Sequence, residues 1–551
     1  MSKYIFGIDL GTTYSCIAYV DEKGVPTVAQ NMEGHNITPS VVNFESPTVV
    51  VSGQIAKENA VLDPDHTVSL VKTLMGKTKV VINYNGRDIS PQEVSSYILK
   101  KMAEDASKIL NTEVKDVVIT HPAYFGSEER QATKDAGDLA GLNVIEVLAE
   151  PTAAALYYGL NKEPGQKTVL VYDLGGGTFD VTVLAIDDGA VKVVCSDGLH
   201  GVGGKNWDDE LMDYLESEFR AQTDFDDEFD SEALQSLRLK AEEAKKSITM
   251  KESIPVRVDA AGISHRVTVD RQTFDSITSN LLSQTIEKTN DCIKVAEDKG
   301  YKIDEIILVG GSTRMPQVTE KLVETYNMEP KILEPDEAVA KGAAIYALLS
   351  YDQKHKIATG QTKEIDDVVE GETISEEDKE KYSIAPVAPV DVITGGRQND
   401  IRQIVTVATT KSYALKAYDN NNVPKCDNLI IKNQEMPGGV VSKSKTYATK
   451  DDNQETVLLE VYESDFMEDE YEVDEYFKLG DCTLILPEGM PKGSPIEVTF
   501  TLNREGIFEI IGREPTSGNE IKAEMKASAG ATLSDEEKEE IKEKVQGVDM
   551  M

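Results

Sequence analysis

The first part of the chain alternates short apolar runs with longer stretches of helical spacing. Apolar runs at 4–8, 117–120, 168–172 and 306–309 have the length of buried strands, whereas 127–140 and 237–248 have the composition and spacing of helices. This alternation continues to about Tyr351 and is typical of an α/β domain. The runs at 4–8 and 168–172 each lead into a glycine turn and then a β-branched stretch, which predicts two β-hairpins.

The two glycine turns are near-copies of each other, DLGTT at 9–13 and DLGGGT at 173–178. Backbone amides in a glycine turn can hold phosphate oxygens, because no Cβ blocks their approach. An Asp at the end of the preceding strand can hold a hydrated Mg²⁺. The pair of turns therefore predicts two related half-domains that hold one nucleotide from opposite sides, with ATP as the leading candidate.

A second duplication supports the first. EPTAAA at 150–155 and EPDEAVAKGAA at 334–344 are both rich in small residues, and the first predicts a helix with Pro in its first turn. Small residues allow two helices to cross at short distance, so the two segments are expected to pack together.

The chain changes character after Tyr351. Residues 361–380 contain nine acidic residues and two lysines with almost no apolar periodicity, which is typical of a solvated linker. From about 401 to 513 short strands such as 456–462 and 496–500 are separated by turn residues, which predicts a β-sandwich. Ser534 begins a capping-box pattern, and one short helix is predicted there.

Charge and composition narrow the possible functions. At 551 residues the chain is long enough for several cores. Its net charge of −41 argues against nucleic acid or an anionic membrane as a partner. The five cysteines form no metal-binding or disulfide pattern, which favours a reducing compartment. With no signal-peptide pattern before 4–8 and no long apolar run, the expected location is cytoplasmic.

Several motifs together resemble the seventy-kilodalton heat-shock chaperone family of the DnaK type. They are GIDLGTTYS at 7–15, PAYF at 122–125, RQATKDAG at 130–137, EPTAAA at 150–155, DLGGGTFD at 173–180 and VGGSTRMP at 309–316. The resemblance continues more loosely through DNQETV at 452–457 and GSPIEVTF at 493–500. The chain is similar to a divergent member of this family with a truncated C-terminal lid.

The resemblance implies a fold, an activity and partners. The fold is an α/β two-lobed ATPase domain of the actin and hexokinase type at 1–351, followed by an acidic insertion and interdomain linker at 352–403. An all-β sandwich that binds substrate is expected at 404–520, and a short helical remnant of the lid at 521–551. The implied function is an ATP-dependent chaperone that binds extended apolar segments of unfolded polypeptides and hydrolyses ATP to ADP and phosphate with Mg²⁺. K⁺ is a further candidate ion, and a J-domain co-chaperone and a nucleotide-exchange factor are the expected partners.

The resemblance also assigns residues. It assigns catalysis of phosphoryl transfer to Lys72, Glu150, Asp173, Thr178 and Asp180. It assigns water-mediated binding of Mg²⁺ to Asp9 and Asp173. The nucleotide is assigned to Gly11, Thr12, Thr13, Tyr14, Gly175, Gly176, Gly177, Gly203, Gly204, Glu242, Lys245, Lys246, Thr249, Gly310, Gly311, Ser312, Arg314 and Asp336. The client peptide is assigned to Tyr418, Lys450, Val457 and Leu459, and a relay between the domains to Pro122 and Arg130.

The sequence departs from the family pattern at points that leave alternatives open. The linker segment 403–407 (QIVTV) lacks the family's acidic residue, and only about 533–545 could be helical where the family has a long lid. These departures keep a second hypothesis open, a regulatory co-chaperone that binds ATP with little hydrolysis and acts through a fixed partner. An actin-like filament is a third class, which the C-terminal β-region and the net charge disfavour. Without the resemblance to the family, Lys72 would be interpreted as an ordinary surface lysine. Val457 and Leu459 could then simply be core residues of the sandwich.

Overall fold

The computed structural model describes residues 3–160, 165–187, 190–360, 376–390, 405–419, 421–503, 506–525 and 533–551. Of the predicted acidic insertion and linker, residues 361–375 and 391–403 lie outside this described part. In the described residues, every helix is too short or too polar to cross a lipid bilayer.

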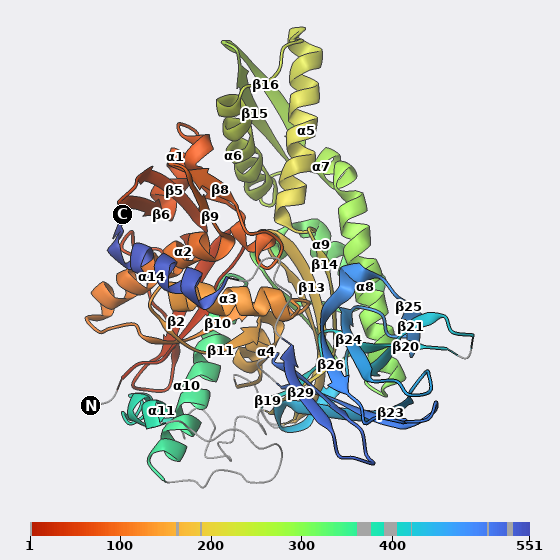
Figure 1. Cartoon of the computed structure of the whole chain (residues 1–551). Helices are drawn as coiled ribbons and strands as arrows, with labels where there is room; N and C mark the ends of the chain where they lie inside the picture. The colour runs from red at the N-terminus through yellow and green to blue at the C-terminus, as the bar shows by residue number, and fades with distance from the viewer. Residues whose placement is uncertain are drawn as a thin grey trace.

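Two similar lobes form the first part of the molecule (Figure 1). The first lobe has a central sheet in the order β11-β10-β1-β2-β3, in which β1 pairs in parallel with β10 and antiparallel with β2. The second lobe has a sheet in the order β18-β17-β12-β13-β14-β19-β22. The bounds are β1 (Phe6–Asp9), β2 (Tyr14–Val20), β3 (Pro26–Val28), β10 (Asp116–His121), β11 (Asn143–Ala149), β12 (Gln166–Leu174), β13 (Thr178–Asp187), β14 (Ala190–His200), β17 (Glu305–Val309), β18 (Lys331–Ile332), β19 (Val405–Ala408) and β22 (Glu435–Met436).

The predicted hairpins are the pairs β1–β2 and β12–β13. Both are antiparallel, and their turns hold the two repeated glycine motifs. The predicted helix crossing is confirmed as well: α4 (Glu150–Leu160) packs against α10 (Ala338–Ala358). A Cβ at Gly342 would lie 1.7 Å from the carbonyl oxygen of Ala153, so only glycine permits this approach.

Each lobe carries further elements around its sheet. In the first lobe, α2 (Pro91–Leu110) and α3 (Ser127–Leu139) pack together, and β5 (Val41–Ser46), β6 (Val49–Ser52) and β7 (Thr67–Ser69) form a small sheet beside α1 (Gln54–Asn59). In the second lobe, a separate layer has α5 (Gly204–Thr223) and α6 (Ser231–Ile248) against the hairpin of β15 (Ser253–Ala260) and β16 (Ile263–Asp270). The remaining elements include β4 (Thr38–Pro39), β8 (Ile82–Tyr84), β9 (Arg87–Ile89), α7 (Arg271–Ile277), α8 (Ser279–Asp298), α9 (Pro316–Tyr326) and α11 (Glu376–Lys381).

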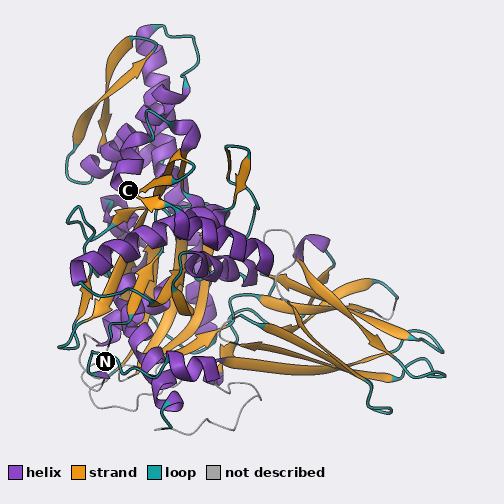
Figure 2. Ribbon diagram, turned by 60° about the vertical axis from the view of Figure 1, so that its left-hand side comes forward, coloured by secondary structure: helices purple, strands orange, loops and turns teal. Residues whose placement is uncertain are grey.

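A β-sandwich projects from one side of the second lobe (Figure 2). One sheet has the order β25-β21-β20-β24-β26 and the other β23-β27-β28-β29. Apolar residues of both sheets, among them Leu415, Val461 and Phe500, form the core between them. The bounds are β20 (Ser412–Tyr418), β21 (Pro424–Ile430), β23 (Val440–Ala448), β24 (Thr456–Ser464), β25 (Glu470–Glu472), β26 (Lys478–Ile485), β27 (Pro495–Asn503), β28 (Phe508–Arg513) and β29 (Glu520–Met525). The last strand continues five residues past the expected boundary at 520, because Ile521 and Ala523 pack against this core.

Two segments after residue 403 pack onto the two lobes. Strand β19 pairs in parallel with the edge strand β14 of the second lobe, with Val405 opposite Val191 and fully buried. The predicted C-terminal helix is confirmed as α14 (Asp535–Gly547), and Ser534 forms its capping box. This helix lies along α2 and α3 of the first lobe, and β30 (Asp549–Met550) adds to the small sheet beside β6 (Figure 1). It therefore does not cover the sandwich as a lid would.

Candidate functional site

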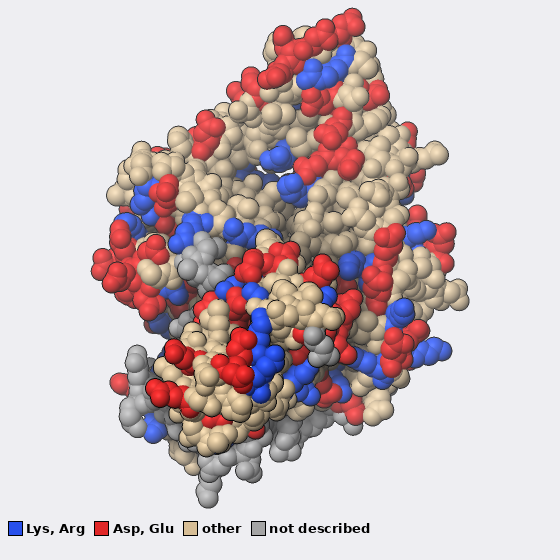
Figure 3. All heavy atoms as spheres, turned by 45° about the vertical axis from the view of Figure 1, so that its right-hand side comes forward, with Lys and Arg blue, Asp and Glu red and all other residues tan. Residues whose placement is uncertain are grey.

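A cavity of about 790 Å³ lies between the two lobes. Figure 3 shows the opening between the lobes, with basic side chains near its rim. Both glycine turns line the cavity, together with α6 and the turn after β17. Of the residues predicted to bind nucleotide or metal, those that line it are Asp9, Gly11, Thr12, Thr13, Tyr14, Lys72, Glu150, Asp173, Gly175, Gly176, Thr178, Gly204, Glu242, Lys245, Lys246, Thr249, Gly310, Gly311, Ser312, Arg314 and Asp336.

The two glycine turns approach each other closely at one end of this cavity. A Cβ built on Gly176 would lie 2.3 Å from Oγ1 of Thr13, so the second turn reaches the first only because this residue is glycine. The amide of Gly11 donates to Oγ of Ser15, and that of Gly175 donates to the carbonyl of Thr178. The expectation of bare amides is therefore wrong at Gly11 and Gly175, which serve to close their own turns.

Buried charges gather beside the turns. The Lys72 ammonium, on a short 3₁₀ turn at Val71–Leu74, pairs with the carboxylate of Glu150, and both residues are less than 10% exposed. Burial and the neighbouring Glu150 raise the pKa of Asp9 to about 7, although Oγ1 of Thr120 donates a 3.2 Å hydrogen bond to it. Burial and the same neighbour raise the pKa of Asp173 well above its usual range.

The electrostatic balance of this centre favours an added cation. Burial opposes the charge on Lys72, but the carboxylates of Glu150 and Asp9 outweigh it and raise the pKa of Lys72. The ammonium of Lys72 thus faces the carboxyl groups of Glu150, Asp9 and Asp173, and the pKa values of Asp9 and Asp173 stay raised although it opposes the rise. Within the described residues, no group of three acidic, His or Cys side chains could hold a metal directly. The residues therefore fit a divalent cation held largely through water or ligand oxygens.

Three predicted residues lie beside the cavity rather than on its surface. Asp180 is 1% exposed, and its Oδ1 accepts a 2.9 Å hydrogen bond from the amide of Ala123 in the first lobe. Gly177 and Gly203 pack against each other's backbone, since a Cβ on Gly203 would lie 2.5 Å from the carbonyl carbon of Gly177. Asp180 therefore joins the two lobes, and the two glycines shape the turn from behind.

A cluster of four side chains bridges the lobes at the other end of the cavity. Tyr14 and Lys57 come from the first lobe, whereas Glu242 and Lys246 come from α6 of the second. Glu242 accepts from Lys57 at 2.6 Å, from Lys246 at 2.6 Å and from the Tyr14 hydroxyl at 3.1 Å. Burial disfavours the carboxylate, but the two ammonium groups lower the pKa of Glu242 to about 2. Sequence reasoning missed Lys57, because its partner lies 185 positions away.

The other predicted charged residues are paired inside the second lobe. Lys245 donates to the carbonyl of Gly204 at 2.7 Å and to Asp208 at 2.9 Å. Arg314 pairs with Asp336 at 2.5 Å. Oγ of Ser312 donates to the carbonyl of Gly175 at 2.9 Å and so connects the turn after β17 to the glycine turn. These contacts hold the side chains that line the cavity in fixed positions.

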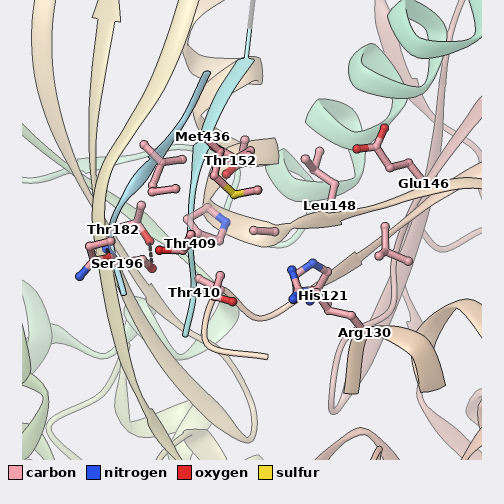
Figure 4. Close-up of a pocket in the computed structure, with 18 of the residues that line it drawn as sticks. His121, Arg130, Glu146, Leu148, Thr152, Thr182, Ser196, Thr409, Thr410 and Met436 are labelled. Carbon is pink, nitrogen blue, oxygen red and sulfur yellow. Dashed lines mark hydrogen bonds between the residues drawn. The ribbon is translucent and has the colours of Figure 1, made fainter. Parts of the chain in front are cut away.

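The two predicted relay residues lie where the lobes meet the linker strand and the sandwich. A second cavity of about 60 Å³ lies there, and Arg130 and His121 line one side of it, opposite Thr409 and Thr410 (Figure 4). His121 is 4% exposed, and its Nδ1 donates to the carbonyl of Pro122. Burial and the Arg130 guanidinium lower the pKa of His121 to about 3, so its imidazole is neutral at physiological pH.

Side chains of the sandwich contact both lobes around this cavity. Glu463 accepts from the amide of Ser127 at 3.3 Å and from its hydroxyl at 2.9 Å, at the start of α3. Lys432 is 8% exposed and lies 3.1 Å from Asp197 of the second lobe. The side-chain oxygen of Asn433 accepts from the amide of Ser196 at 2.9 Å, and its backbone carbonyl accepts from Lys299 at 2.7 Å. None of these contacts has a local sequence signal, because every partner is more than 100 positions away.

The predicted peptide residues lie at one edge of the sandwich. The ammonium of Lys450 lies 4.1 Å from the ring centroid of Tyr418, so these two side chains are in contact. Val457 is half-buried at the edge of the core, whereas Leu459 is 2% exposed within it. Between them, Leu458 is 52% exposed on the opposite face of β24.

Comparison with known proteins agrees with this arrangement. The family model described as Hsp70 protein matches residues 5–358 and 391–550. The chain belongs to the Hsp70 family. It is 35% identical over 527 residues to "Chaperone protein DnaK" of Thermotoga neapolitana, covering 94% of this chain and 79% of that one. It is likewise 35% identical over 543 residues to "Chaperone protein DnaK" of Thermosipho melanesiensis, covering 97% and 82%. The two-lobed domain, the sandwich and the short final helix are thus those of a divergent Hsp70 chain.

Proposed function

We propose that this Hsp70 chain is an ATP-hydrolysing chaperone that binds extended apolar peptide segments in its β-sandwich, with the nucleotide controlling its affinity for peptide. The observation that carries the proposal is the interlobe cavity, in which Lys72 lies among the carboxyl groups of both repeated hairpins. This arrangement supplies what phosphoryl transfer needs, namely fixed positive charge and precise positioning at a highly charged transition state.

The roles proposed for single residues are those that the family resemblance implies, and the contacts described above support them. Lys72, held by Glu150, would orient the attacking water and stabilise charge on the γ-phosphate, with Thr178 beside it. The glycine turns would hold the phosphates, and Glu242, Lys245, Lys246, Thr249, Gly310, Ser312 and Arg314 would line the adenosine end. Mg²⁺ held through water by Asp9 and Asp173 would neutralise phosphate charge when bound. Asp180 would hold the two lobes together through its hydrogen bond with the amide of Ala123.

Coupling between nucleotide and peptide is supported by a continuous path. Thr120, near the end of β10, contacts Asp9, and the next residue, His121, lines the cavity beside Arg130 and donates to the carbonyl of Pro122. Across this cavity lies β19, which connects the second lobe to the sandwich. This docked strand supports coupling even though the linker lacks the family's acidic residue. A J-domain protein and a nucleotide-exchange factor are the partners proposed for the cycle.

The test is the dissociation rate of a fluorescent leucine-rich peptide from the full chain, measured with ADP and then after adding ATP. Faster release with ATP, together with steady ATP hydrolysis, is the expected result. Equal rates would mean that the two domains work independently. ATP binding without hydrolysis would favour the regulatory alternative. The same measurements on Lys72→Ala separate the two steps, because this variant should bind ATP without turning it over.

A further inference from the structure

Two buried thiols that the proposed function does not use lie side by side in the second lobe. Cys195 is on β14 and Cys292 is on α8, and their sulfur atoms are 3.4 Å apart. The two residues are 0% and 2% exposed. We propose that this pair is a redox-modification site, which a hydroperoxide converts into a reversible disulfide between β14 and α8.

The surrounding contacts orient the pair for this reaction. Cys195 Sγ lies 3.2 Å from the carbonyl oxygen of Cys292, so the thiol of β14 is directed at the backbone of α8. A disulfide requires a sulfur–sulfur distance of about 2.05 Å. The sulfur atoms must therefore approach by about 1.35 Å, a movement that side-chain rotation and a small shift of α8 can share.

The environment distinguishes the two sulfurs. The hydrogen bond from the Cys292 thiol lowers the pKa of Cys195, and the nearby ammonium of Lys299 adds to this effect against burial. The same hydrogen bond and burial raise the pKa of Cys292 well above its usual range. Lys299 also donates to the carbonyl of Val194, the residue before Cys195, at 2.6 Å, so its positive charge lies on the Cys195 side of the pair. Cys195 is thus the thiol that attacks peroxide, because the thiolate is the nucleophile. Cys292 is the thiol that resolves the product.

The steps balance with hydrogen peroxide as the oxidant. The Cys195 thiolate attacks one peroxide oxygen, the O–O bond breaks, and the products are a sulfenic acid on Cys195 and hydroxide, which takes up a proton to become water. The Cys292 sulfur then attacks the sulfenic sulfur, the S–O bond breaks, and the departing hydroxide leaves as water with the thiol proton. Two thiols and one peroxide give one disulfide and two waters. A small-molecule thiol reverses the reaction by exchange.

The position of the pair connects it to the docked sandwich. Ser196 follows Cys195 directly, and its amide holds the side chain of Asn433 at 2.9 Å. Lys299, just after the end of α8, donates to the carbonyls of Val194 and Asn433 at 2.6 and 2.7 Å. Both anchors of Asn433 therefore adjoin the two elements that the disulfide would draw together. Oxidation should displace one anchor relative to the other and weaken docking of the sandwich.

The test uses the full-length chain treated with hydrogen peroxide and analysed by mass spectrometry without reduction. We expect the intact mass to fall by two hydrogen atoms, a linked pair of peptides that contain Cys195 and Cys292, and full reversal by dithiothreitol. The Cys482→Ala variant should still form the link. In Cys292→Ala a sulfenic-acid probe should label Cys195, whereas in Cys195→Ala it should leave Cys292 unlabelled.

Hydrogen exchange at residues 405–408 reports on docking. Losing one docking hydrogen bond corresponds to about 1 kcal/mol, so exchange there should be roughly fivefold faster after oxidation and return after reduction. Two results would overturn the proposal. One is that both thiols stay reduced while peroxide oxidises Cys482. The other is that a disulfide forms between different cysteines. A Cys195–Cys292 disulfide with unchanged exchange would overturn the effect on docking while leaving the modification site in place.

Discussion

Replacing Lys72 with alanine removes the ammonium group that pairs with Glu150 in its buried position. The carboxyl group, 7% exposed, would then lie near Asp9 and Asp173 without an opposing charge. Removing one partner of a buried ion pair costs about 3–5 kcal/mol. The group can limit this cost by taking up a proton. For a carboxyl with an ordinary pKa of about 4.3, protonation costs about 3.7 kcal/mol at pH 7 and about 1 kcal/mol at pH 5.

The expected loss of folding stability in the nucleotide-free Lys72→Ala variant is therefore about 3–4 kcal/mol at pH 7 and about 1 kcal/mol at pH 5. The sign follows from linkage. A buried carboxyl group without an opposing charge binds a proton more readily in the folded chain than in the unfolded chain, so the variant loses less stability at low pH and more as pH rises. Urea unfolding of variant and parent at both pH values, followed through the transition of the ATPase lobes, measures the difference.

Turnover by the same variant tests the catalytic role. ATP hydrolysis should fall to background while ATP binding persists, and Lys72→Arg, which keeps the charge, should recover much of the stability without the hydrolysis. An equal stability loss at both pH values would refute the idea that an unpaired carboxyl causes it. Unchanged turnover in Lys72→Ala would remove Lys72 from the mechanism.

Three further outcomes are expected. Val457→Phe should abolish binding of a leucine-rich peptide while ATPase activity persists. The control variant Leu458→Phe, on the opposite face of β24, should bind the peptide normally. Normal peptide binding by both variants would mean that the peptide binds at another site. Lys432→Ala should weaken docking of the sandwich by about 1–2 kcal/mol, roughly 5- to 30-fold. The loss should be this small because Asp197 still pairs with Lys288 at 3.0 Å. Adding Asp197→Ala should cost little more, and fully additive losses in the double variant would exclude direct coupling between Lys432 and Asp197. Glu242→Gln should speed ADP release by about tenfold, as expected for about 1.4 kcal/mol. The parent chain should approach this faster rate of ADP release only as pH falls from about 4.5 toward the lowered pKa of Glu242, about 2, where the carboxylate is protonated and its ion pairs are lost. An unaltered release rate in Glu242→Gln would show that the cluster around Glu242 does not hold the nucleotide.

Features with a local origin were predictable from the sequence. The two hairpins follow from apolar runs and glycine turns, and the close crossing of α4 and α10 follows from small residues at Ala153 and Gly342. The short C-terminal helix follows from the capping pattern at Ser534. The hairpin and helix signals lie within the elements themselves, and the crossing was predictable because both repeated segments are rich in small residues.

Features made by distant residues were not predictable. The pairing of Lys57 with Glu242 and of Lys432 with Asp197 depends on how the lobes and sandwich are placed, and lysine and acidic residues are too common to reveal a specific pair. The same reason explains the position of α14. Its pattern predicts a helix, but Val545 becomes fully buried only against the first lobe, where Lys538 pairs with Asp135 at 2.7 Å.

The pairing of β19 with β14 covers part of the outer edge of β14, at Val191 and Lys192. A chain shortened at residue 351 or 403 would leave this part of the edge without its neighbour. Such an edge offers unpaired amides and carbonyls to any strand that approaches, and a second copy of the shortened chain is the most abundant candidate. Isolated lobes that end before residue 404 should therefore self-associate with increasing concentration. Lobes that retain 404–410 would carry their own cover for this edge.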